Sequence, residues 1–322
     1  MIVHAPHRSP LQQRLVSGSL LAGAIIALVA LDGWLAGVEP PPRWMLGGVN
    51  LGHWLYHGAL VTLTMLVLTL LAVRELLRLA RHLGYRPLRF ETYVFAAGLI
   101  VGPYVSYNVR DTAAIYDESL GMLWLAVALG YAFWAHAVRR GTERVIQNVA
   151  VTLFFIFFAG GLGGYLTKLR MEVGGPQGAT VLLFSIFLVK MTDVGAFFTG
   201  LLIGRHKFVP WLSPKKTWEG VIGGIAVAVA CAAGVGNSLH HHGWIHLGEG
   251  SFAGGWGLAL FGFVMALFSI AGDLAESLLK RDAAVKDSSN MIPGMGGVLD
   301  ILDSPLLAAP AAWYYWTRLA HL

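Results

Sequence analysis

The densest group of ionisable residues in the chain lies between Gly272 and Ser304. Lysines and an arginine alternate there with carboxylates, so charges of both signs would converge if the segment folded on itself. An ordinary solvated loop accounts for the charge but not for this mixture of signs. Six of the chain's 18 acidic residues fall in the segment, namely Asp273, Glu276, Asp282, Asp287, Asp300 and Asp303.

The spacing of these residues indicates phosphate chemistry. Asp300 and Asp303 are three residues apart, which places both carboxylates on one face of a helix. Carboxylate oxygens are suitable ligands for a hard cation such as Mg²⁺, which also takes oxygens of substrate phosphates. The neighbouring Lys and Arg side chains suit the phosphates themselves. A glycine-rich turn at 293–297 would let the backbone approach a ligand closely.

A second segment, Ser213–Thr217, offers the complementary half of such a site. It places two lysines and two hydroxyls directly before a predicted helix, whose N-terminus would itself favour an anion. Lys190 and Asp193 are three residues apart within an apolar run, where charged side chains are costly and face a polar interior. For this pair, a structural ion pair and a catalytic role for Asp193 both stay open.

The elements that must position these residues are membrane helices. The chain has 322 residues, of which 56% are hydrophobic and only 13% charged, and its mean hydropathy is +0.63. A helix of about 20 apolar residues crosses a bilayer core. We therefore predict an all-α fold, a polytopic transmembrane helical bundle of about nine spans that forms a single membrane domain over 1–322. The predicted spans are 15–36, 51–73, 90–109, 120–138, 149–166, 180–203, 221–236, 254–272 and 305–316.

The distribution of Lys and Arg predicts the orientation of these spans. Most of the 23 Lys and Arg residues fall at the N-terminus and in the even-numbered connections, and cytoplasmic loops collect such residues. The chain is therefore expected to be an integral membrane protein with a cytoplasmic N-terminus. Both charged segments, in the sixth and eighth connections, would lie on the cytoplasmic side. Topology and anionic membrane lipids then explain the net charge of +5, and nucleic acid is not an expected partner.

Both charged segments resemble the signature regions of phosphatidate cytidylyltransferases (CDP-diacylglycerol synthases). The stretch Ser213–Gly220 and the preceding Asp193 are similar to one preserved region of that family. The resemblance covers 190–304, the expected catalytic region, and it extends to the N-terminal half only as hydrophobic spans. In the downstream region the matching residues are Ser277, Lys280, Arg281, Lys286, Asp287, Gly296, Gly297, Asp300 and Asp303.

The resemblance implies a nucleotidyltransferase that condenses CTP with phosphatidic acid, using Mg²⁺, to give CDP-diacylglycerol and pyrophosphate in phospholipid biosynthesis. It also implies a bacterial inner membrane, contact with membrane lipids and a homodimer. Asp273, Asp287, Asp300 and Asp303 are expected to bind metal, and the last three are expected to be catalytic together with Lys286. The residues expected to bind the triphosphate and the lipid phosphate are Ser213, Lys215, Lys216, Lys280 and Arg281.

Two positions depart from the family pattern. Met295 stands where the family has His, and Ile301 stands where it has Arg. A relative with altered lipid specificity or weakened activity is therefore one alternative. A membrane transporter is another alternative, suggested by the many spans and by Lys190 and Asp193 within a span. Against a transporter, the charges gather in two connections on one side rather than along the spans.

Overall fold

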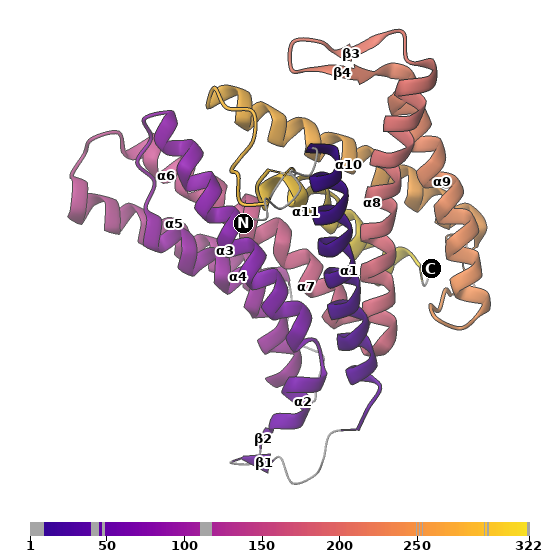
Figure 1. The fold of residues 1–322 in the computed structure, drawn as a ribbon. Coiled ribbons are helices and arrows are strands. Elements are labelled where there is room, and N and C mark those ends of the chain that lie inside the picture. The colour runs from indigo at the N-terminus through magenta and orange to yellow at the C-terminus, as the bar shows by residue number, and fades with distance from the viewer. Residues whose placement is uncertain are drawn as a thin grey trace, which may run out of the picture.

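The computed structural model describes residues 10–39, 45–46, 49–109, 118–248, 250, 252, 254–292, 294 and 296–320, which form a bundle of long helices (Figure 1). The first part of the chain contains α1 (Pro10–Ala36), the short strands β1 (Met45–Leu46) and β2 (Val49–Asn50), α2 (Leu51–Tyr56), α3 (Ala59–His82), α4 (Arg89–Val109) and α5 (Glu118–Arg140). A continuous helical segment follows, composed of α6 (Val145–Phe155), the π-helical η1 (Ile156–Gly161) and α7 (Leu162–Val173). The last part contains α8 (Gly175–Ile203), β3 (Lys207–Val209), β4 (Ser213–Thr217), α9 (Trp218–His241), α10 (Gly255–Asp282), α11 (Leu299–Tyr314) and η2 (Tyr315–Leu319).

Seven helical segments among the described residues are long and apolar enough to cross a membrane, which confirms the predicted polytopic bundle. They are α1, α3, α5, the α6–α7 segment, α8, α9 and α10. The predicted number of spans was therefore only approximate. The predicted spans at 90–109 and 305–316 correspond to α4 and to α11 with η2, which are not among the seven; α11 has only 16 residues. The predicted span at 51–73 is interrupted at Gly58, which lies between α2 and α3 and has a left-handed φ of 82°.

Glycines let the helices that carry the charged residues approach one another closely. Where α9 crosses α8, a Cβ atom at Gly224 would lie 2.8 Å from the carbonyl oxygen of Thr192. Where α10 crosses α11, a Cβ atom at Gly272 would lie 2.5 Å from the carbonyl oxygen of Asp303. Helices in lipid associate largely through such close packing of small residues. The backbones of α8 and α9, and those of α10 and α11, are therefore in direct contact near the charged segments.

A buried polar contact joins the N-terminal helices. Asp32 Oδ2 of α1 lies 2.7 Å from Arg170 Nε of α7, and both side chains are only 1% exposed. The backbone N–H groups of Leu60 and Val61, in the first turn of α3, donate hydrogen bonds to Asp32 Oδ1. One carboxylate thus pairs with a guanidinium group of α7 and accepts hydrogen bonds from two backbone N–H groups of α3 inside an apolar bundle.

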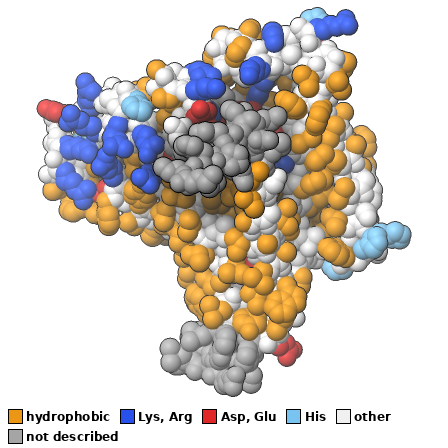
Figure 2. Space-filling model, viewed as in Figure 1, with side chains coloured by type: hydrophobic (Ala, Val, Ile, Leu, Met, Phe, Trp, Pro, Cys, Tyr) orange, Lys and Arg blue, Asp and Glu red, His pale blue; other side chains and the backbone are white. Residues whose placement is uncertain are grey.

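One end of the bundle is polar, and the helices away from it are largely apolar on their surface. Figure 2 shows Lys and Arg side chains gathered at the end that carries the β3–β4 hairpin, with hydrophobic side chains covering the helices below. The hairpin pairs Lys207 with Thr217 and Val209 with Ser213, and it projects beyond the helices (Figure 1). Thr217 then caps α9, because its hydroxyl accepts a hydrogen bond from the Gly220 N–H at 3.1 Å. The prediction that this lysine-bearing segment directly precedes a helix is confirmed.

Candidate active site

A cavity of about 590 Å³ lies at the polar end, where β4 meets α8, α9, α10 and α11. Part of its lining is apolar and includes Phe197, Leu201, Val221 and Ile270. The remainder is mainly charged, and both charged segments of the sequence contribute to it. The charged lining residues are Lys190 and Asp193 of α8, Lys215 and Lys216 of β4, Asp273, Glu276 and Lys280 of α10, and Asp300 and Asp303 of α11.

Helical periodicity explains why α10 delivers three charged side chains to the cavity. Asp273, Glu276 and Lys280 are three and four residues apart, so they lie on one face of the helix. Lys280 forms an ion pair with Glu276 and also lies 2.6 Å from Asp300 Oδ1 of α11. Lys216 Nζ of β4 lies 2.7 Å from Asp273 Oδ2. The two charged segments are therefore joined by a direct ion pair.

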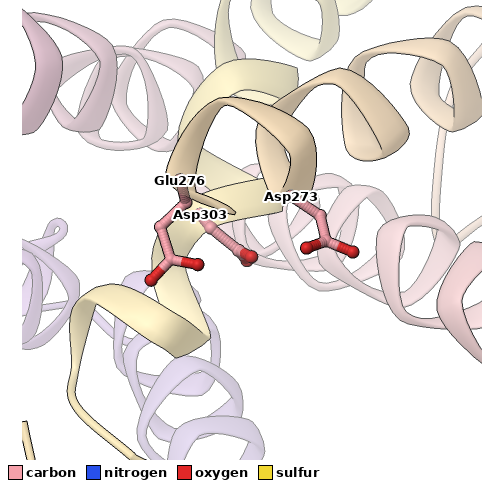
Figure 3. Close-up of side chains that lie close together, drawn as sticks. All are labelled: Asp273, Glu276 and Asp303. Carbon is pink, nitrogen blue, oxygen red and sulfur yellow. The ribbon is translucent and has the colours of Figure 1, made fainter. Parts of the chain in front are cut away.

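Three carboxylates form a cluster that suits a metal cation. Ligand oxygens of Asp273, Glu276 and Asp303 lie within 4.8 Å of one another, and Figure 3 shows Asp303 of α11 between the two residues of α10. Glu276 and Asp303 are buried. Burial, with a further contribution from the Asp273 carboxylate, raises the pKa of Asp303 to about 7. Because like charges with little access to water need compensation, this oxygen-only set fits a hard divalent cation.

Asp300 has a different environment, although it is on the same helix as Asp303. Its carboxylate accepts hydrogen bonds from Lys280, from the backbone and hydroxyl of Ser288, and from the Gly297 N–H at 2.6 Å. Burial opposes ionisation of Asp300, but these hydrogen bonds together lower its pKa. Asp300 therefore binds Lys280 and the connection between α10 and α11, whereas Asp303 belongs to the acidic cluster.

The charge balance of the cavity gives a second reason to expect a cation. The described lining residues include five carboxylates and four lysines, a net formal charge of −1 when all are ionised. That balance does not favour a polyanionic ligand. One divalent cation would change the sum to +1, and the lysines would then be available to neutralise phosphate groups. The residues present fit a metal-dependent site for a phosphorylated ligand.

Six of the residues predicted for the site line this cavity: Lys215, Lys216, Asp273, Lys280, Asp300 and Asp303. The other four are not among the described lining residues. Ser213 begins β4, and Arg281 donates a hydrogen bond to the Val285 carbonyl oxygen. Lys286 and Asp287 are exposed in the connection between α10 and α11. The roles of these four residues stay predictions, and Met295 lies outside the described residues.

Glu276 is a lining carboxylate for which no role was predicted from the sequence. It is three residues from Asp273, and the one-face argument used for Asp300 and Asp303 would have identified it. Lys190 and Asp193 form the ion pair that was one of the two alternatives, with 3.5 Å between Nζ and Oδ2. Because both also line the cavity, this ion pair does not remove Asp193 from the site.

The fold and the cavity define the class of the protein: an integral membrane protein with a metal-suited, lysine-lined site at its polar end. Comparison with known proteins gives the family within that class. The Cytidylyltransferase family matches residues 43–319. The chain therefore belongs to the cytidylyltransferase family, a family of nucleotidyltransferases, as the sequence predicted.

Proteins named phosphatidate cytidylyltransferase are similar to this chain. The one from Haemophilus influenzae is 30% identical over 244 residues, which cover 70% of this chain and 79% of that protein. The one from Synechocystis is 26% identical over 289 residues, 82% of this chain and 89% of that protein. A match to the Brucella suis protein is shorter, with 39% identity over 159 residues that cover 49% of this chain and 54% of that protein. None of these matches supports the transporter alternative.

Proposed function

We propose that this chain condenses CTP with phosphatidic acid, or a closely related lipid phosphate, to give CDP-diacylglycerol and pyrophosphate. The observation that carries the proposal is a cavity in which lysines of β4 meet carboxylates of α10 and α11. Membership of the cytidylyltransferase family supplies the reaction class. The names of the relatives support the lipid substrate.

The proposed reaction needs charge stabilisation more than acid–base chemistry. A phosphate oxygen of phosphatidic acid forms a bond to the α-phosphorus of CTP, and the bond from that phosphorus to the bridging oxygen of the β-phosphate breaks. The electron pair of the broken bond leaves with pyrophosphate. Because the attacking oxygen is already anionic near neutral pH, no strong general base is required. Positioning two polyanions and stabilising the leaving charge are the main tasks of such a site.

The described lining residues can perform these tasks. Asp273, Glu276 and Asp303 would hold Mg²⁺, which when bound neutralises charge on the triphosphate and on the departing pyrophosphate. Lys215 and Lys216 would neutralise phosphate groups. Lys280, fixed by Asp300 at 2.6 Å, would add a third cation. We also propose that the phosphates are contacted by Ser213, Arg281 and Lys286, and that the metal is contacted by Asp287.

The apolar part of the lining suits entry of a lipid from the bilayer. Phe197 and Leu201 of α8 line the cavity, and they are 64% and 69% exposed on the surface of the bundle. An apolar surface therefore leads directly to the charged lining. We infer that the acyl chains remain in the membrane while the headgroup phosphate reaches the lysines.

We further propose that the N-terminus and the site face the cytoplasm of a bacterial inner membrane. The bias of Lys and Arg along the sequence supports this orientation. The bacterial origin of the relatives supports the assignment to a bacterial membrane. Residues 190–304 are the proposed catalytic region of a single membrane domain over 1–322. A homodimer is proposed on the family resemblance alone.

Pyrophosphate release from CTP by the purified protein in lipid nanodiscs tests the function. We expect release with phosphatidic acid and Mg²⁺, and none with diacylglycerol, which lacks the attacking phosphate. Release with another lipid phosphate but not with phosphatidic acid would favour the altered specificity suggested by Met295 and Ile301. Absence of release with every lipid phosphate would contradict the proposed function.

A further inference from the structure

Glu75 of α3 is a fully buried carboxylate that is not among the described residues lining the cavity. Its Oε1 accepts hydrogen bonds from the Ser289 hydroxyl at 2.6 Å and from the Val298 N–H at 3.1 Å. Its Oε2 accepts a hydrogen bond from the Leu299 N–H at 2.8 Å, and the Ser288 hydroxyl lies 2.8 Å from it and shares its one proton between Glu75 and Asp300. A carboxylate from the N-terminal half is therefore at the centre of the connection between α10 and α11.

Glu75 caps the start of α11. Val298 and Leu299 are at the start of that helix, and the first N–H groups of a helix have no partner within it. A negative charge at this position is also favoured by the helix dipole. The connection fits closely around the carboxylate, because a Cβ atom at Gly297 would collide with both Glu75 oxygens and with the Ser288 hydroxyl.

The connection that Glu75 holds also holds the acidic residues of the site. The Ser288 hydroxyl lies 2.8 Å from Glu75 Oε2 and 2.6 Å from Asp300 Oδ2. The Gly297 N–H donates to Asp300 at 2.6 Å. Asp303 is one helical turn further along α11, in the acidic cluster. A shift in the start of α11 would therefore move both aspartates.

We propose that Glu75 is a positioning residue for the acidic cluster. It acts by holding the 288–299 connection, so that Asp300 meets Lys280 and Asp303 meets the carboxylates of α10. This inference rests on the proposed function, because that function is the reason to expect a metal ion at the acidic cluster. A purely structural carboxylate would affect only the stability of the protein, whereas a positioning residue also affects how tightly the cluster binds a metal ion.

Glu75→Gln in the full-length protein separates these roles. The side-chain amide keeps the shape, but its NH₂ group faces the backbone N–H of Val298 or Leu299, which cannot accept a hydrogen bond. We expect faster hydrogen exchange in 288–299, measured by mass spectrometry, with little change elsewhere. The Mg²⁺ concentration that gives half the maximal rise in Tm should increase about 10-fold or more, since groups that orient metal ligands typically change affinity by about 10–100-fold.

Glu91→Gln is the matched control. Glu91 of α4 is also a buried helical carboxylate, but its ion-pair partner is Arg139 of α5, at 2.6 Å. This substitution should lower Tm without changing the Mg²⁺ dependence. If Glu75→Gln kept the wild-type Mg²⁺ dependence and the wild-type exchange of 288–299, the proposal would be overturned, whatever its Tm.

Ser289→Ala keeps the proposal testable if Glu75→Gln does not fold. It removes the 2.6 Å hydrogen bond to Glu75 Oε1 and the acceptor of the Met291 N–H, whose own exchange is therefore left out of the comparison, and it leaves the contacts of Asp300 in place. We expect a smaller change in the same direction, and unchanged exchange and Mg²⁺ dependence would count against the proposal. Both readouts are independent of catalysis. A wild-type protein that makes no CDP-diacylglycerol would contradict the proposed function, while these comparisons would still decide the role of Glu75.

Discussion

At the scale of single residues, lysines and carboxylates from separate elements meet in the cavity. Lys216 is on β4 and Asp273 on α10, yet their charged atoms are 2.7 Å apart. Lys280 of α10 contacts Glu276 on its own helix and Asp300 on α11. Each lysine therefore stabilises a carboxylate and remains beside the space that a phosphate would occupy.

Lys216→Met tests the contribution of β4 to substrate binding. The substitution keeps an unbranched side chain but removes the charge. We expect the KM for CTP to rise about 10-fold or more, because a hydrogen bond to a charged group contributes about 1.5–3 kcal/mol. Lys207→Met is the control, since Lys207 is exposed on β3 and is not among the described lining residues. Equal KM values for the two variants in steady-state assays would remove Lys216 from the CTP site.

Asp303→Asn tests the acidic cluster. The amide keeps the shape but removes one of the three charges near the proposed metal position. We expect a folded protein that has lost the Mg²⁺-induced rise in Tm and about 100-fold or more of its activity. Asp282→Asn, at the exposed end of α10, should retain both properties. Full activity of Asp303→Asn in the pyrophosphate assay would exclude Asp303 from metal binding.

At the scale of elements, the site depends on how closely α10 and α11 cross. Gly272 of α10 faces the backbone of Asp303 and Ser304, where a Cβ atom would lie 2.5 Å from the Asp303 carbonyl oxygen and 2.8 Å from Ser304 Cα. The crossing therefore fixes the distance between Asp273 on one helix and Asp303 on the other. Gly272 is followed directly by Asp273, and the backbone that it contacts belongs to Asp303 and Ser304. A change in the packing of the two helices would therefore move the carboxylates of the acidic cluster.

Gly272→Ala should separate the two helices. Alanine favours a helix more than glycine does, so a loss of stability must come from the crossing. We expect about 1–3 kcal/mol of destabilisation from overpacking, with a lower kcat. Gly234→Ala in α9 is the control, because nothing lies within 4 Å of its Cβ position. Thermal unfolding and kcat that are the same in both variants would contradict the importance of this crossing.

The sequence predicted the apolar helices and the two charged segments, but not how the second segment is held. Long apolar runs determine α8, α9 and α10, and the lysines before α9 were recognisable from their spacing. The 288–299 connection could not be predicted, because Ser288 bonds to Glu75, which is 213 residues away in the sequence. The break at Gly58 was missed because the long apolar run after it was extended back through His53 and His57, whereas the left-handed φ of 82° at Gly58 separates α2 from α3.

At the scale of the whole molecule, the helices that support the polar end also bury charged side chains. The buried pair of Asp32 and Arg170 joins α1 to α7, and Asp32 also accepts hydrogen bonds from the start of α3. Removing one member would leave the other charged and buried. The stability of the N-terminal helices should therefore depend strongly on this pair.

Asp32→Ala should lower the free energy of unfolding by about 3–5 kcal/mol, because it leaves Arg170 buried without a counter-charge. Glu39→Ala is the control, since Glu39 is exposed just beyond α1. Adding Arg170→Met to Asp32→Ala should recover part of the loss. Denaturant unfolding in a fixed lipid–detergent mixture measures all three variants. An Asp32→Ala protein as stable as Glu39→Ala would show that the pair contributes little.

We propose that the cavity at the polar end transfers the cytidylyl (CMP) group of CTP to a lipid phosphate. The most direct measurement follows radiolabel from CTP into chloroform-soluble lipid, using purified protein, phosphatidic acid and Mg²⁺. We predict that label in the α-phosphate enters the lipid and that label in the γ-phosphate is released as pyrophosphate. Absence of α-label from the lipid fraction, or appearance of γ-label in it, would contradict the claim.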